Sequence, residues 1–182
     1  MLIMPCIIDS RKTKPGLSMI DQDEPAGDGE ARRISRRVAF AAEVEERTGI
    51  DEAMIHLLVH SFYDRVRVDP LLGPVFEARI ADWSPHLERM CAFWSSVVLM
   101  TGRYHGRPMQ AHAPLTVDAT HFDRWLALFE VTAREICPSA AAELFTEKAQ
   151  MIARSLELGI ATHRGQLLMP GERLTTAGIA TI

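Results

Sequence analysis

The fold of this chain is decided between Phe62 and His112, where the sequence reads FYDRVRVDPLLGPVFEARIADWSPHLERMCAFWSSVVLMTGRYHGRPMQAH. The stretch contains three histidines and is dense in aromatic side chains. His86 and His112 lie on separate segments of helical character, whereas His105 falls in a loop rich in glycine and proline. The pattern therefore indicates a helical core in which two imidazoles are set among aromatic rings.

Apolar residues recur at steps of three and four along several segments, which is typical of amphipathic helices. No alternating strand pattern and no internal repeat is visible in the sequence, so we predict an all-α fold. The clearest helix should follow a capping Asp51 and end before Pro70. A second should begin at Ser84 and Pro85, a capping serine with proline at the first helical position. The remaining expected helices are a short one over 109–112, one capped by Asp118 and a long one opened by Pro138 and Ser139.

The composition is that of one globular domain. With 182 residues, 47% apolar content and a net charge of −4, the chain is too short for two comfortable domains. Its mildly acidic balance gives no general footprint for nucleic acid, and the apolar start is interrupted by Pro5 and ended by Asp9, far short of a membrane span. Three cysteines without paired spacing indicate a reducing compartment. We therefore expect a cytoplasmic protein that binds neither nucleic acid nor a membrane.

The domain is expected to carry an extension at each end. Residues 1–49 should be largely disordered, because their first part is polar and rich in helix breakers, with one helix at 31–47. The domain itself should cover 50–164, followed by a flexible tail at 165–182. Four arginines form a basic cluster within 32–37, a pattern that is most often a solvated helix face.

His86 and His112 have surroundings that a haem-binding histidine needs. His86 shares one helix face with Met90 and Trp94, so its ring should point inward. His112 follows a breaker-rich loop, so its ring can be oriented independently of the long helices. Haem requires a flat apolar slot, an imidazole with a free nitrogen on one side and a controlled polar group on the other. One imidazole could therefore bind iron while the hydroxyl of Tyr63 and the second imidazole face a bound gas.

Each of these residues also has an ordinary structural interpretation. An inward-facing histidine is commonly a core residue that hydrogen-bonds to a carbonyl, and Tyr63 can equally be a core tyrosine. His56, His60 and Asp64 recur at helical spacing but should face solvent, and they lack the glutamate that follows the first histidine in zinc proteases. A helical interaction module without a cofactor is therefore one alternative.

The sequence carries four linked motifs, which are Phe62-Tyr63-x-x-Val66-Arg67-x-Asp69-x-Leu71-Leu72-Gly73-Pro74-Val75-Phe76, Trp83-x-x-His86, Phe93-Trp94 and Thr101-Gly102-Arg103-Tyr104-x-Gly106-x-Pro108-x-x-x-His112. Two later ones are Phe122-x-x-Trp125-Leu126-x-Leu128-Phe129 and Ala149-x-x-Ile152-Ala153-x-Ser155-Leu156. Together they resemble the truncated haemoglobins, specifically those of group III. The resemblance covers roughly residues 50–163 and implies a truncated globin fold, in which two pairs of helices form a two-over-two sandwich around haem b.

The resemblance assigns roles to the residues that match these motifs. By carry-over, His112 is the expected proximal iron ligand. Tyr63, His86 and Trp125 match the distal polar residues that face a bound gas. His86 could also bind the iron directly when no gas is present.

Further residues are expected to contact the haem itself. Phe76, Arg103 and Tyr104 follow from the resemblance, and the others from their place on the apolar helix faces. They are Phe76 on the haem face, Arg103 and Tyr104 near a propionate, and Met90, Trp94, Leu115, Phe122 and Phe129 along the walls.

The expected function is reversible binding of dioxygen or nitric oxide at ferrous iron. Hydrogen bonds from distal residues are worth about 0.5–1.5 kcal/mol each and would slow release of the gas, which suits redox chemistry better than oxygen transport. Nitric oxide dioxygenation and peroxidase-like turnover, supported by an unidentified reductase, are the activities between which the sequence does not choose. A second alternative keeps the haem but makes the protein a gas or redox sensor, whose basic cluster at 32–37 docks a partner.

Overall fold

The computed structural model describes residues 26–176. This part of the chain contains seven helices and no strand, which confirms the all-α prediction. None of these helices is both long enough and apolar enough to cross a membrane. The helices are α1 (Ala26–Thr48), α2 (Glu52–Val68), α3 (Gly73–Glu77), α4 (Trp83–Val98), α5 (Pro108–His112), α6 (Ala119–Ile136) and α7 (Ser139–His163).

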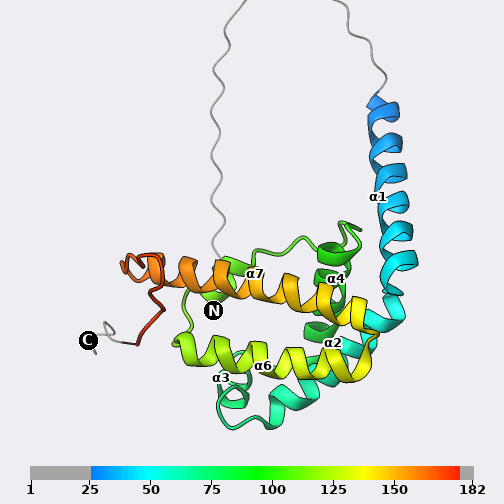
Figure 1. Ribbon diagram of the computed structural model, residues 1–182. Helices are drawn as coiled ribbons and strands as arrows, with labels where there is room; N and C mark the ends of the chain where they lie inside the picture. The colour runs from blue at the N-terminus through cyan, green and yellow to red at the C-terminus, as the bar shows by residue number, and fades with distance from the viewer. Residues whose placement is uncertain (1–25, 177–182) are drawn as a thin grey trace, which may run out of the picture.

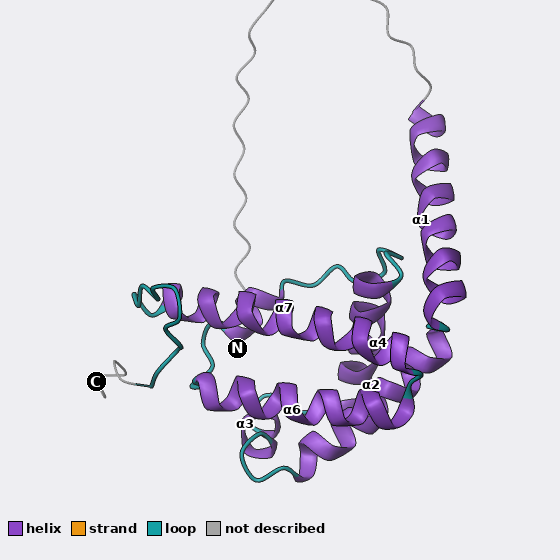
Figure 2. Ribbon diagram, in the orientation of Figure 1, coloured by secondary structure: helices purple, strands orange, loops and turns teal. Residues whose placement is uncertain are grey.

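Two pairs of helices form the body of the molecule. α6 and α7 pack along each other, and α2 packs against both α4 and α6. Figure 1 shows α6 and α7 side by side with α2 and α4 crossing behind them, and Figure 2 shows that loops alone connect these helices. The short α5 packs on α7, and α3 packs on α2. The body therefore has the two-over-two arrangement of a truncated globin.

Aspartates at two expected positions start long helices. Asp51 accepts a hydrogen bond from the amide of Met54 (2.7 Å) at the start of α2, and Asp118 accepts one from the amide of Thr120 (3.0 Å) at the start of α6. These bonds satisfy amides that have no partner within the helix. His121 completes a capping box with Asp118, so α6 is fixed at the end that lies nearest α5 in sequence.

The prediction that Ser84 caps α4 is wrong. The helix begins at Trp83, and the carboxylate of Asp82 accepts a hydrogen bond from the amide of Ser84 (3.1 Å). A carboxylate is a stronger acceptor than a hydroxyl. Pro85 is tolerated in the first turn because an N–H at that position would have no partner inside the helix. His86 consequently lies in the first turn of α4.

Aromatic rings fill the space between the helix pairs. Phe129 of α6 stacks on Trp94 of α4, with 4.9 Å between ring centroids, and on Trp125 of its own helix at 5.2 Å. Phe62 of α2 meets Phe129 edge to face at 5.1 Å and Trp125 at 5.3 Å. Such pairs stabilise a core beyond the burial of their apolar area. This aromatic stack joins α2, α4 and α6.

A buried carboxylate ties the turn after α2 to α6. Asp69 accepts hydrogen bonds from the amides of Leu71 (3.0 Å) and Leu72 (2.9 Å) and from Nε of Arg124 (2.7 Å). Its side chain is only 2% exposed. Burial alone would raise the pKa of Asp69, but the bonds from Leu72, Arg124 and Leu71 outweigh it and lower the pKa below its ordinary value.

We expect Asp69→Asn to lower the free energy of unfolding by about 1–3 kcal/mol at neutral pH, since it removes an ion pair and weakens the acceptor for two amides. A depressed folded-state pKa stabilises the protein above the unfolded-state value, and this contribution is lost as the pH falls through the folded-state value. Urea unfolding should therefore show that Asp69→Asn loses less free energy of unfolding, relative to wild type, at about pH 3 than at about pH 7. The exposed Asp64→Asn is the control. An equal loss at both pH values would contradict a role for the charge.

The described part of the N-terminal extension is helical. The last turns of α1 pack on the body through the buried Val44, whereas Ile34 and Val38 are exposed, and Figure 1 shows α1 standing away from the body. The disorder that we expected concerns residues 1–25, which lie outside the described residues. Of the expected tail, residues 165–176 are described and contact the body, and residues 177–182 lie outside.

Candidate functional site

A cavity of about 430 Å³ lies among α2, α4, α5, α6 and α7. Its volume is in the range of cofactor and small-molecule sites, which are typically apolar with a few placed polar groups. Aromatic and aliphatic side chains form most of its wall. The cavity brings together ten of the residues that the sequence predicted, which are Tyr63, Phe76, His86, Met90, Trp94, Tyr104, His112, Leu115, Phe122 and Trp125.

A second hollow, of about 500 Å³, lies where α6 ends and α7 begins. Its wall includes the charged side chains Glu130, Arg134, Glu143 and Glu147 and contains no histidine or aromatic ring. Such a lining suits water better than an apolar ligand. The aromatic cavity is therefore the candidate site.

His112 enters the cavity from the last residue of α5. α5 begins at Pro108, whose fixed backbone dihedral suits the first position of a helix. The carbonyl of Pro108 lies 2.7 Å from Nδ1 of His112. Because a carbonyl can only accept, Nδ1 must carry a proton, and in the neutral ring Nε2 then keeps its lone pair. A ring held in this way has the tautomer and the fixed orientation of a metal-binding histidine.

His86 enters the cavity from the first turn of α4. Its Nε2 is buried and has no hydrogen-bond partner among the described residues. Buried polar atoms without a partner are rare in folded proteins and require an explanation. Burial first, and then the charges of Arg89 and His112, lower the pKa of His86 below its ordinary value. The ring is therefore neutral at physiological pH, with a polar atom that is available to a ligand.

Tyr63 lies beside His86 in the same wall. The two rings are nearly perpendicular, with centroids 5.2 Å apart, and Phe76 meets the tyrosine edge to face at 5.8 Å. Tyr63 is only 5% exposed, and burial, assisted by Cys91, raises the pKa of its hydroxyl well above the ordinary value. The hydroxyl therefore stays protonated, and it makes no hydrogen bond within the part of the chain that the structure describes.

Trp125 lines the cavity from α6, where it is packed between other rings. Its indole lies against Phe129 on one side and against the edge of Phe62 on another. An indole nitrogen is a donor only, so Trp125 adds a second potential donor to the wall that Tyr63 forms. Three residues that carry polar groups, from α2, α4 and α6, thus line one apolar space.

Two of the predicted haem contacts do not line the cavity. Arg103 instead forms an ion pair with Glu52 (3.0 Å) at the start of α2 and is more than half exposed. Phe129 is buried behind Trp94 and Trp125, where it supports two rings of the wall. Arg103 therefore stabilises the loop before α5, and Phe129 belongs to the core.

Two arginines that the sequence analysis missed do line the cavity. Arg89 lies three residues after His86, so it shares that side of α4, a spacing that was available in the sequence. Arg79 follows α3, where no helical period points to it, and its side chain donates to the carbonyl of Pro114 (3.3 Å). Guanidinium groups are preferred partners of carboxylates, so this pair suits an acidic edge of a ligand.

The donor set fits haem better than a bare metal ion. Among residues 26–176 no group of three or more histidine, cysteine, aspartate or glutamate side chains could hold a metal. His56 and His60 stack with centroids 3.9 Å apart on α2, outside the cavity. A single imidazole with a free Nε2, set in an aromatic cavity, fits an iron whose other ligands come from a macrocycle.

Comparisons with known proteins point the same way. A family model described as bacterial-like globin matches residues 44–156. The group 3 truncated hemoglobin ctb of Campylobacter jejuni subsp. jejuni serotype O:2 is 32% identical over 109 residues, which are 57% of this chain and 86% of that protein. The crystal structure of the group III truncated hemoglobin from Campylobacter jejuni matches with a TM-score of 0.56 and 31% identity, covering 59% of this chain and 88% of that one.

Proposed function

This chain belongs to the bacterial-like globin family, and we propose that it holds haem b in the aromatic cavity and binds dioxygen or nitric oxide there reversibly. One observation carries the proposal. His112, with its free Nε2, lines the same cavity as His86, whose buried Nε2 lacks a partner among the described residues. The imidazole of His112 can bind the iron, and the imidazole of His86 can form a hydrogen bond with the gas.

We assign His112 as the iron ligand. Its Nδ1–H donates to Pro108, which holds the ring in one orientation and makes Nε2 more basic. Haem held there would supply an iron that can bind the imidazole of His112 and a diatomic gas. His86 is the less suitable ligand, because no hydrogen bond in the described residues fixes the tautomer of its ring.

Tyr63, His86 and Trp125 are the proposed gas-binding residues. The raised pKa of Tyr63 keeps its hydroxyl a donor at physiological pH, and the indole N–H of Trp125 is always one. His86 is neutral, so its Nε2 can either donate or accept, depending on the tautomer. Each hydrogen bond to the gas contributes about 0.5–1.5 kcal/mol net. Two bonds at the upper end of this range would slow release about a hundredfold.

The remaining cavity residues hold the haem by packing and charge. Phe76, Met90, Trp94, Leu115 and Phe122 supply the apolar walls, with Tyr104 beside them. For the propionates we propose Arg79 and Arg89 in place of Arg103, because the two lining arginines face the cavity while Arg103 pairs with Glu52. The two guanidinium groups would then balance the two propionate charges.

We expect Tyr63→Phe to speed dioxygen release about tenfold, since it deletes one hydrogen bond worth up to about 1.4 kcal/mol. The measurement is stopped-flow displacement of dioxygen from the ferrous protein. Tyr104→Phe is a matched control, because the chain has two tyrosines, both line the cavity, and Tyr104 lies on the loop before α5. If the two variants release dioxygen at the same rate, Tyr63 does not hold the gas.

Slow release suits a redox reaction of the bound gas. Conversion of one nitric oxide and one dioxygen to one nitrate ion consumes one electron, so nitric oxide dioxygenation needs a reductase as partner. Peroxidase-like turnover has the same need for an electron donor. We place the protein in the cytoplasm, because Cys91 and Cys137, the cysteines of the described chain, are free thiols.

A further inference from the structure

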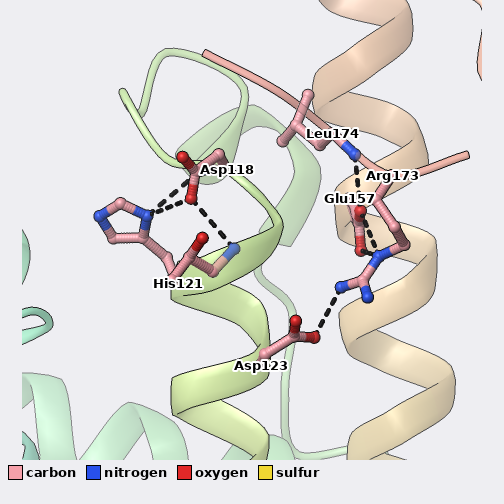
Figure 3. A network of polar contacts seen from close by, with 7 residues as sticks. Asp118, His121, Asp123, Glu157, Arg173 and Leu174 are labelled. Atoms are coloured by element: carbon pink, nitrogen blue, oxygen red, sulfur yellow. Dashed lines mark hydrogen bonds and ion pairs between the residues drawn. The ribbon is translucent and has the colours of Figure 1, made fainter.

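Residues 164–175, the C-terminal strap, lie beyond residues 44–156, which match the globin family. It folds back over α7 toward the start of α6. Figure 3 shows Arg173 and Leu174 of the strap beside Glu157 of α7, with Asp123 of α6 reaching toward Arg173 and with Asp118 and His121 paired at the start of α6. The strap thus connects two elements that border the cavity.

The strap is attached to α7 by a buried carboxylate. Glu157 is only 9% exposed at its side chain, and it accepts hydrogen bonds from Nε of Arg173 (2.8 and 3.1 Å) and from the amide of Leu174 (2.8 Å). The other end of the Arg173 guanidinium reaches Asp123 of α6 (2.7 Å). A buried charge is tolerated only when it is paired, so Glu157 requires the strap in place.

The strap also holds the chain that follows His112. Leu174 is 1% exposed and packs with Val117, and its carbonyl accepts a hydrogen bond from the amide of Ala119 (2.9 Å). Arg164, where the strap begins, donates to the carbonyl of Leu115 (2.5 Å). Leu115 and Val117 line the cavity. The chain from Leu115 to Ala119 is therefore attached to the strap at three points.

On the other side of His112, α5 contacts α7 directly. The side chain of Met109 in α5 lies against Gly159, and a Cβ at Gly159 would overlap its Sδ and Cε atoms. α5 thus rests on α7 two residues after Glu157. His112 lies between the Met109 contact on one side and the strap contacts on the other.

We propose that the C-terminal strap is a clamp for the proximal side of the cavity, and that Arg173 is a positioning residue for His112. The strap fixes Leu115–Ala119 and α7 fixes Met109, so the ring of His112 is held from both directions along the chain. This inference rests on the proposed function, because it takes His112 as the iron ligand. Outer-shell partners of metal ligands typically change metal affinity by about 10–100-fold.

The test uses full-length Arg173→Gln and, as matched control, Arg154→Gln, which makes the same charge change at an exposed site on α7. Two rates are measured: transfer of haem from the ferric protein to an excess of apoglobin, and hydrogen exchange of the Ala119 amide in the haem-free protein. We expect Arg173→Gln to raise the haem transfer rate about tenfold, the lower end of the range for outer-shell partners, because Arg173 acts on His112 through the strap and not by direct contact. The Ala119 amide should exchange faster in this variant, and Arg154→Gln should match wild type in both rates.

Leu174→Ala keeps the test decisive if Arg173→Gln does not fold, because it loosens the strap without leaving a buried charge. Leu174→Ala should also raise the rate of haem transfer and the rate of hydrogen exchange at the Ala119 amide. Haem transfer at the control rate from both strap variants, while wild type holds haem, would overturn the clamp alone. Failure of wild type to take up haem would overturn the proposed function together with the clamp.

Discussion

Replacement of His112 by alanine is expected to abolish histidine ligation of the haem. The substitution removes the imidazole whose Nε2 is free and whose Nδ1 is held by Pro108. We expect haem affinity to fall by more than about a hundredfold, beyond the effect of losing an outer-shell partner. Absorption and resonance Raman spectra of the reconstituted ferrous protein measure the loss, and added imidazole should restore ligation by occupying the vacated space.

His105→Ala is the matched control for this variant, because His105 lies in the loop before α5, is exposed and does not line the cavity. Its spectra should match those of wild type. If His112→Ala keeps a histidine-ligated spectrum and His86→Ala loses it, the roles of the two histidines are reversed.

The largest expected effect on stability comes from Phe129→Ala. Phe129 is 1% exposed and contacts Trp94, Trp125 and Phe62, so its removal leaves a cavity at the centre of the aromatic stack. Loss of a buried phenylalanine costs about 3–5 kcal/mol, a large part of the stability of a typical domain. Urea unfolding of the haem-free protein measures the difference.

Phe40→Ala is the control for this prediction, because Phe40 of α1 is 38% exposed and surface replacements usually change stability by less than about 0.5 kcal/mol. Below its unfolding transition, Phe129→Ala should still give the histidine-ligated spectrum, since Phe129 does not line the cavity. Comparable stability losses in the two variants would contradict the central place of Phe129 in the core.

The helices were predictable because their signals are local. Asp51 and Asp118 cap the helices that the apolar periods predict, and these positions are recovered in the structure. The error at Ser84 has a local cause as well: Asp82 and Ser84 are both good caps two residues apart, and the carboxylate prevails. When two good capping residues lie close together, small differences in energy determine which one caps the helix, and a sequence pattern does not contain these differences.

The candidate site was predictable where helix faces decide it. His86, Met90 and Trp94 share a face of α4, and all three line the cavity. Arg103 and Phe129 do not, because their places depend on tertiary partners: Glu52 lies far from Arg103 in sequence, and the stack with Trp94 places Phe129 behind the wall. Motif resemblance assigns a residue to a neighbourhood, whereas contacts decide which way its side chain faces.

The contacts of the strap had no sequence signal for a similar reason. The composition of residues 165–182 predicts a flexible tail, and the contacts of the part described depend on long-range pairs. These pairs join Arg173 and the Leu174 amide to Glu157, Arg173 to Asp123, and the Ala119 amide to Leu174. A buried glutamate in α7 is visible only once its neighbours are known.

The central claim, that the aromatic cavity holds one haem on a protein histidine, is tested most directly by titration of the purified haem-free protein with haemin. Absorbance in the Soret region should rise to saturation at one equivalent per chain, and reduction should give the spectrum of histidine-bound ferrous haem. A linear rise without saturation, with the broad spectrum of free haemin, would contradict the claim.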